Sequence, residues 1–185
     1  MRKNFGPKPI LYPQPVFIIA TYNADGTANA MNAAWGGISE SNEISMCISD
    51  DHKTTENALA RGAFTVSMGT ADYVAACDYV GIVSGSKVPD KLARAGFHIT
   101  KSEHVDAPLI DELPMAVECR LKHYDPESCR MVGEVVNVCA DERVLTDGKI
   151  DPFKLKPIVF DGMNMTYMTL GEKVGKAFSD GKKFK

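Results

Sequence analysis

The chain has 185 residues, of which 24% are charged and 44% are hydrophobic, and its formal net charge is −3. This length supports one well-packed domain, and the composition is that of an ordinary globular protein. The small negative charge gives no electrostatic reason to expect nucleic acid or an anionic membrane as a partner. We therefore predict a single domain over residues 1–185, with its core at about 14–171 and a C-terminal tail at 172–185.

The N-terminus and the cysteines predict a cytoplasmic protein without a metal. Proline and glycine interrupt the segment behind Arg2 and Lys3, so it is not a secretory signal, and no apolar run approaches membrane-spanning length. The five cysteines are odd in number and form no C-x-x-C pair, so neither a disulfide framework nor a zinc ribbon is expected. The four histidines have no metal-ligand spacing.

The first half of the chain predicts a β-hairpin and then two strands on either side of a short helix. Residues 16–22 are β-branched and aromatic, which is typical of a strand, and the chain returns through a turn as residues 27–34. Further strands are predicted at 44–49 and 64–68, with a helix at about 55–60 between them.

The second half predicts two helices and a long hairpin. Helices are expected at 71–83 and 90–95 from their apolar spacing and flanking residues. From Met115 the pattern alternates, which indicates a half-buried strand with Glu118 on its polar face, and residues 130–140 form its antiparallel partner. Six or seven strands with a few short helices predict a mainly β protein, an antiparallel barrel with short α insertions.

The segment 50–57 joins a predicted strand to a helix and permits two interpretations. In the first, Thr54 caps the helix, and Glu56 or Asn57 lies in the first turn. In the second, the exposed N–H groups and the positive end of the helix dipole bind an anion such as a phosphate. A lysine, a histidine and two threonine hydroxyls beside the helix start favour such a site.

The order of these segments resembles the FMN-binding split-barrel flavin reductase family, and its flavoredoxin-like branch in particular. The segments that carry the resemblance are 29–35, Ser39, 49–50, 52–55, Ser84-Gly85, Asp90-Lys91, Pro114 with Glu118-Cys119, 133–135 and Tyr167-x-x-Leu170-Gly171. The resemblance spans roughly residues 16–171. It implies an antiparallel split β-barrel that binds FMN and forms a homodimer with the flavin near the interface.

The resemblance also implies which residues hold the cofactor. The residues assigned to the phosphate are Ser49, Asp50, His52, Lys53, Thr54 and Thr55, and those assigned to the ring are Asn32, Ala33, Ala34 and Trp35. Trp35 belongs either to the core or to the border of the flavin. Lys91 reaches either the cofactor or solvent. No catalytic residue is expected, because flavin hydride chemistry belongs to the cofactor.

The function implied is that of an FMN-dependent oxidoreductase, which passes hydride from NADH or NADPH to the flavin and then to an acceptor. The alternative is a flavoredoxin-type carrier of electrons between redox proteins, without direct oxidation of a nicotinamide. A third ligand class, haem or deazaflavin, fits the Lys53-Thr54-Thr55 cluster less well than FMN. Asn42-Glu43 and Ala33-Ala34 replace residue pairs common in the wider family, which favours the flavoredoxin-like branch.

Overall fold

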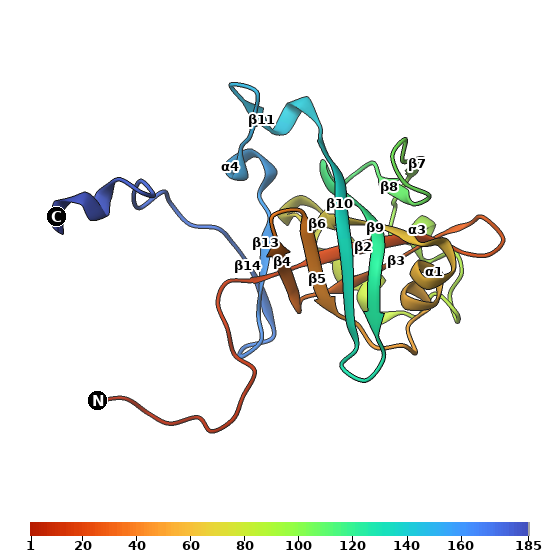
Figure 1. Ribbon diagram of the computed structural model, residues 1–185, viewed down its shortest axis with the longest axis horizontal. Coiled ribbons are helices and arrows are strands. Elements are labelled where there is room, and N and C mark those ends of the chain that lie inside the picture. The colour runs from red at the N-terminus through yellow and green to blue at the C-terminus, as the bar shows by residue number, and fades with distance from the viewer. Residues whose placement is uncertain (185) are drawn as a thin grey trace.

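The computed structural model describes residues 1–184, and its largest element is a seven-stranded antiparallel sheet (Figure 1). The strands follow the order β3-β2-β6-β9-β10-β5-β4. Their bounds are Phe17–Tyr22 for β2, Ala28–Ala33 for β3, Gly36–Glu40 for β4, Glu43–Cys47 for β5, Ala63–Met68 for β6, Met115–Asp125 for β9 and Arg130–Ala140 for β10. The predicted strands are all present, and β3 and β4 lie at the two edges.

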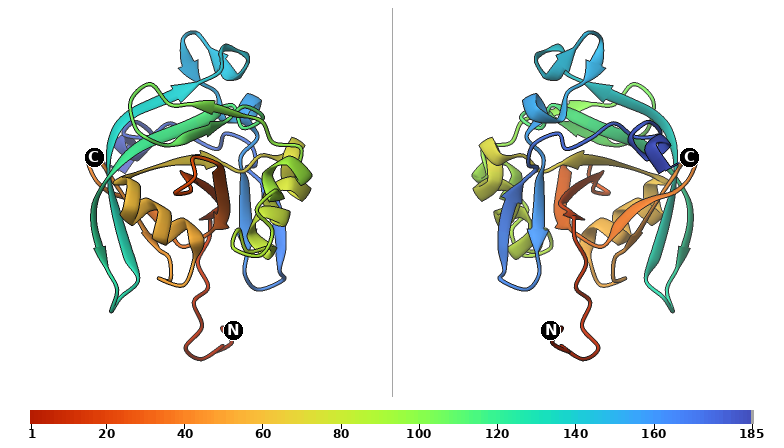
Figure 2. Two further views of the ribbon diagram at one scale, coloured as in Figure 1. Left: turned by 90° about the vertical axis from the view of Figure 1, so that its right-hand side faces the viewer. Right: turned by 90° about the vertical axis from the view of Figure 1, so that its left-hand side faces the viewer.

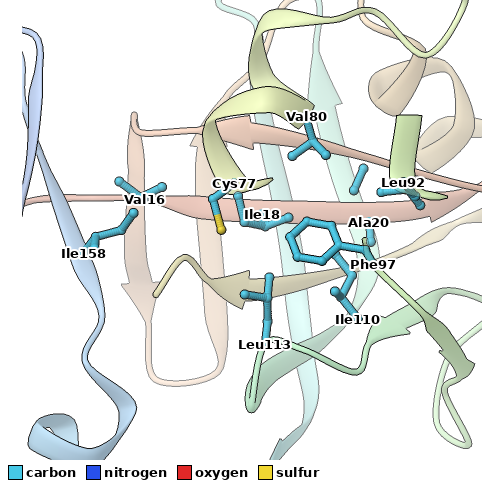
Figure 3. Packing of buried hydrophobic residues seen from close by; sticks show 11 residues of the cluster. Val16, Ile18, Ala20, Cys77, Val80, Leu92, Phe97, Ile110, Leu113 and Ile158 are labelled. Carbon is cyan, nitrogen blue, oxygen red and sulfur yellow. The ribbon is translucent and has the colours of Figure 1, made fainter. Parts of the chain in front are cut away.

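Buried side chains on the two faces of β2 form two separate cores. Phe17 and Ile19 pack with residues of β5, β6, β9 and β10, so the sheet curls around this core as a half-barrel. Ile18 and Ala20 point to the opposite face, because side chains alternate along a strand. Figure 3 shows the second core, where Val80 packs with Ile18 and Ala20.

The helices lie on opposite faces of the β2–β3 hairpin. Helix α1 (Lys53–Arg61) contributes Ala58 to the core inside the half-barrel. Helix α2 (Val74–Ile82), which follows a 3₁₀ turn at Ala71–Tyr73, contributes Cys77 and Val80 to the other core. The shorter helical elements are α3 (Lys91–Arg94), α4 (Pro152–Leu155) and 3₁₀ turns at Glu142–Val144 and Asp180–Phe184. The predicted helices at 55–60, 71–83 and 90–95 are thus confirmed with shifted ends.

Three small sheets complete the fold. One has the order β1-β13-β14, and the other two pair β7 with β8 and β11 with β12. Their bounds are Gln14–Pro15 for β1, Ile99–Lys101 for β7, Pro108–Ile110 for β8, Leu145–Thr146 for β11, Lys149–Ile150 for β12, Ile158–Asp161 for β13 and Thr166–Thr169 for β14. Strand β14 brings the C-terminal part of the chain beside α2, where Tyr167 packs against the second core.

Strand β4 was not expected, because Gly36 and Gly37 weaken a strand. Close packing against β5 explains why residue 36 is a glycine. A Cβ atom at Gly36 would lie 2.7 Å from Met46 Cγ and 2.8 Å from the Ser45 carbonyl oxygen. Glycine therefore allows β4 to approach β5 closely.

Glu118 on β9 was predicted on the polar face of a half-buried strand, but it is buried. Its Oε1 atom accepts a hydrogen bond of 2.6 Å from Asn137 Nδ2, and its Oε2 atom accepts one from the Ser102 hydroxyl. These partners satisfy the carboxylate, which alternation alone does not reveal. Cys119, the next residue, pairs with Val135 beside a register shift in β10.

Both terminal segments extend away from the body in Figure 1, and Figure 2 shows the N-terminal one projecting below it. Phe5 and Leu11 on the first segment, and Val174 and Phe178 on the second, are exposed. The last residue of the predicted tail, Lys185, lies outside the described residues. Over residues 1–184, no helix has the length and apolar character needed to cross a membrane.

The close packing at Gly36 predicts different effects for the two neighbouring glycines. We expect Gly36→Ala to lower the free energy of unfolding by about 1–3 kcal/mol, because the added methyl group overlaps Met46 and the Ser45 backbone. Gly37→Ala is the matched control, since a Cβ there meets nothing within 4 Å. Urea unfolding of both variants measures the difference, and equal stabilities would contradict the packing argument.

Candidate functional site

Strand β3 is an edge strand whose side chains reach both helices. Within residues 1–184 it pairs with β2 alone, so its other edge has no strand partner. Asn29 hydrogen-bonds Thr54 on α1, whereas Asn32 Nδ2 donates to the Cys77 carbonyl on α2 at 3.1 Å. Ala33 ends the strand without a bulky side chain. An open edge of small residues can present backbone groups to a flat ligand.

Helix α1 begins at Lys53, earlier than predicted, and His52 is its N-cap residue. No side chain caps this start, so the predicted cap by Thr54 is wrong. The N–H groups of Thr55 and Glu56 donate to the His52 carbonyl at 2.9 and 3.1 Å. In the described chain, the N–H groups of Lys53 and Thr54 have no hydrogen-bond partner. They lie at the positive end of the helix dipole and suit an anion.

The threonine hydroxyls are engaged within the protein. The buried Thr55 hydroxyl donates to the Ser49 carbonyl at 2.7 Å, and so fixes the loop before the helix. Thr54 Oγ1 accepts a hydrogen bond of 2.8 Å from Asn29 Nδ2, and it keeps its own hydrogen as a donor. Thr54 is therefore not a cap because its hydroxyl faces the edge strand. Direct contact of either hydroxyl with a phosphate stays a prediction.

Asn29 joins the edge strand to the loop after α2. It is only 3% exposed, and its Oδ1 atom has no hydrogen-bond partner in residues 1–184. A Cβ atom built at Gly85 would lie 2.1 Å from this oxygen and 3.7 Å from Lys53 Cγ. The three segments around Asn29, Lys53 and Gly85 therefore meet at one place. The sequence prediction left Asn29 out of the cofactor-binding residues, although it belongs to the motif that carries the resemblance.

The charged residues before and at the helix start are more exposed. Asp50 and His52 are exposed on the loop. Lys53 Nζ lies 2.6 Å from Glu56 Oε1, in a pair one helical turn apart. Exposed pairs of this kind contribute little stability. The Lys53 ammonium can therefore leave Glu56 for a stronger anionic partner at low cost.

Trp35 is 53% exposed, which excludes the interpretation that it belongs to the core. Together with Ala34 and Gly36 it lines a cavity of about 430 Å³, whose other wall is the N-terminal segment from Lys8 to Pro15. This volume is within the range of about 300–1,000 Å³ that ligand pockets occupy. The cavity adjoins the end of β3, and its role at the flavin stays a prediction.

Lys91 is only 2% exposed, so the predicted solvent-exposed alternative is wrong. Its Nζ atom donates to the Val80 and Val83 carbonyls, each at 3.0 Å. Val80 lies in the last turn of α2 and Val83 is its C-cap residue, where carbonyl groups lack intrahelical partners. Burial lowers the pKa of Lys91 to about 8. Lys91 thus anchors the end of α2 from which the Gly85 segment begins, and direct contact with a cofactor stays a prediction.

Cys77 is a buried core thiol. Burial raises its pKa to about 11, so the reactive thiolate is scarce near neutral pH. Cys77 is therefore an inert core residue. Between residues 1 and 184, no cluster of three or more His, Cys, Asp or Glu side chains is arranged to hold a metal ion.

The buried amine of Lys91 predicts a pH-dependent stability. The pKa of Lys91 is about 8 in the folded chain, against an ordinary value of 10.5. In the window between these two pH values the unfolded chain binds more protons than the folded chain, so the free energy of unfolding rises with pH. We expect the free energy of unfolding of the wild type, relative to Lys91→Met, to increase across the window by at most about 3 kcal/mol. Urea unfolding at several pH values measures this difference. The exposed Lys87→Met variant is the control, and a Lys91→Met difference that stays constant with pH would contradict the prediction.

Comparison with solved structures relates the chain to flavoredoxins and to a flavin reductase-like domain. Flavoredoxin of Desulfovibrio vulgaris (Miyazaki F) is 38% identical, with a TM-score of 0.94 and coverage of 98% of this chain and 100% of that chain. Flavoredoxin from Methanosarcina acetivorans is 27% identical, with a TM-score of 0.89 and full coverage of both chains. The FMN-binding domain of a flavin reductases-like enzyme from Shewanella baltica OS155, at 19% identity and a TM-score of 0.75, shares the fold over 88% of this chain and 89% of that chain.

These neighbours confirm the predicted mainly β split-barrel class and its flavoredoxin-like branch. The profile of the flavin reductase like domain matches residues 10–163, which is most of the chain. The chain therefore belongs to the flavin reductase like domain family.

Proposed function

We propose that this chain is an FMN-binding oxidoreductase that takes hydride from NADH or NADPH and delivers electrons to an acceptor. The proposal rests on one observation above all. The start of α1, with two unpartnered N–H groups, faces the segment at Gly85, and both adjoin the open edge strand β3. FMN needs both an anion site and a flat surface, and these are adjacent here.

The residues present fit an FMN phosphate. The N–H groups of Lys53 and Thr54 would donate to its oxygens, and the Lys53 ammonium would add a counter-charge. Glycine at position 85 lets the loop lie directly against Asn29, because a Cβ atom there would overlap Asn29 Oδ1.

The ring system would lie along the edge strand, beside Asn32, Ala33 and Ala34, with Trp35 at its border. When bound, FMN supplies hydride acceptance and electron release. The residues of this chain would orient the ring and restrict access of water. The half-buried alanines permit the close approach that a planar ring requires.

A second candidate is a flavoredoxin-type carrier that moves electrons between redox proteins without oxidising a nicotinamide. The relatives named flavoredoxin, at 38% and 27% identity, favour it. The residues proposed to hold FMN are the same for both candidates. They differ in the electron donor alone.

We also propose a homodimer. The terminal segments carry exposed apolar side chains, including Phe5, Leu11, Val174 and Phe178, that contact no core of their own chain. Apolar groups left in water favour association with another surface. A second copy of this chain would cover them.

The phosphate site predicts a selective effect of Lys53. We expect Lys53→Ala to weaken FMN binding by about 10–100-fold, because a charge-assisted hydrogen bond is worth about 1.5–3 kcal/mol. Riboflavin lacks the phosphate, so its affinity should not change. Fluorescence titration of both flavins gives the two dissociation constants.

Glu56→Ala is the matched control for Lys53→Ala, because it removes the paired residue and leaves the cation. Its FMN affinity should equal or exceed that of the wild type. An equal loss of FMN and riboflavin affinity in Lys53→Ala would show that the phosphate does not bind there.

Anaerobic titration distinguishes the two candidate functions. We expect the FMN-loaded protein to lose its visible absorption rapidly on addition of NADH or NADPH. Bleaching by a reduced ferredoxin but by neither nicotinamide would establish the carrier instead. A purified protein that is colourless and binds no added FMN would contradict both.

A further inference from the structure

Three side chains from distant parts of the sequence meet beside the edge strand. Tyr167 on β14 donates its hydroxyl hydrogen to Asp78 Oδ1 on α2 at 2.7 Å. Asn32 on β3 lies at the same place, since its Nδ2 atom donates to the carbonyl of Cys77, the neighbour of Asp78. The Asn32 carboxamide is also close enough to the Tyr167 hydroxyl to influence its pKa.

The contacts around Asn32 determine which way its carboxamide points. The Cys77 carbonyl oxygen can only accept, so the amide nitrogen of Asn32 must face α2. The Asn32 Oδ1 atom therefore points away from that carbonyl, and it has no hydrogen-bond donor in the described part of the chain. The geometry leaves a fixed acceptor oxygen next to Ala33.

Packing restricts this group further. A Cβ atom at Gly81 would lie 2.8 Å from Asn32 Cβ, so α2 lies directly against Asn32. The ring of Tyr167 packs on Phe160, with their centroids 6.0 Å apart. Burial, followed by the hydrogen bond to Asp78, raises the pKa of Tyr167 to about 12, so its hydroxyl keeps the hydrogen that it donates at neutral pH.

A fixed acceptor at this edge matches one feature of the oxidised flavin ring. That ring carries a single N–H group, N3–H, between two carbonyl groups that can only accept. We propose that Asp78 and Tyr167 are positioning residues, which hold Asn32 so that its carboxamide oxygen accepts the N3–H of the flavin. This inference rests on the proposed binding of FMN and names the atom that selects the ring.

The test compares FMN with 3-methyl-FMN, in which a methyl group replaces the N3 hydrogen. Wild type should bind FMN more tightly, and Tyr167→Phe should weaken FMN binding by about 3–10-fold through loss of one hydrogen bond in the network. The affinity of Tyr167→Phe for 3-methyl-FMN should stay unchanged. The ratio of the dissociation constant for 3-methyl-FMN to that for FMN should therefore be lower than in the wild type. Asp78→Asn should lower the ratio in the same direction, and Asn32→Ala should remove the dependence on Tyr167.

Tyr79→Phe is the matched control, because Tyr79 also lies on α2 and packs on the same core, but its phenol adjoins Arg94 instead of Asn32. Its ratio should equal that of the wild type. Thermal unfolding of each variant separates positioning from stability. A ratio that stays at the wild-type value in Tyr167→Phe and Asp78→Asn, with or without a lower melting temperature, overturns the inference. A wild type that binds neither flavin contradicts the proposed function itself.

Discussion

The buried hydrogen bond from Asn29 Nδ2 to Thr54 Oγ1 joins the edge strand of the sheet to the start of α1. Both side chains are shielded from water, so removal of either leaves a polar group unpaired, at a cost of about 1–3 kcal/mol. The bond therefore joins the strand that ends at Ala33 to the first turn of the helix that begins at Lys53. Under the proposed function, this connection holds the ring surface and the anion site together.

Two glycines bring the remaining wall against the same strand. Gly81 allows α2 to contact Asn32, and Gly85 allows the following loop to contact Asn29. Any side chain at either position would separate the helix or the loop from β3. Lys91 then fixes the end of α2 between them through its two carbonyl contacts. The wall beside the edge strand therefore depends on close backbone approach and on one buried amine.

The local sequence pattern was sufficient to predict the main strands and helices. It was not sufficient to predict the hydrogen-bond partners of the buried polar side chains. The hairpin of β2 and β3 and the pair of β9 and β10 follow from periodicity and turn residues, which act within a few positions. The partners of Thr54, Lys91 and Glu118 were not predictable in this way. Asn29 lies 25 residues from Thr54, and Asn137 lies 19 from Glu118, so tertiary packing decides these contacts. Lys91 differs, since its partners are 11 and 8 residues away, but its burial depends on the packing of α2.

The ionisable groups on the α2 side of the strand are poorly suited to proton transfer. The Asp78 carboxylate accepts the Tyr167 hydroxyl, the Cys77 thiol has a pKa of about 11, and the Lys91 amine faces two carbonyls. Under the proposed function, such a wall would orient the flavin and leave the redox chemistry to it. The choice between the two proposed functions then depends on access. A nicotinamide has to stack on a face of the flavin ring that no protein segment covers. Electron transfer to a protein partner can occur with that face covered. The exposed Trp35 borders a cavity at the end of β3, and the N-terminal segment from Lys8 to Pro15 forms its other wall.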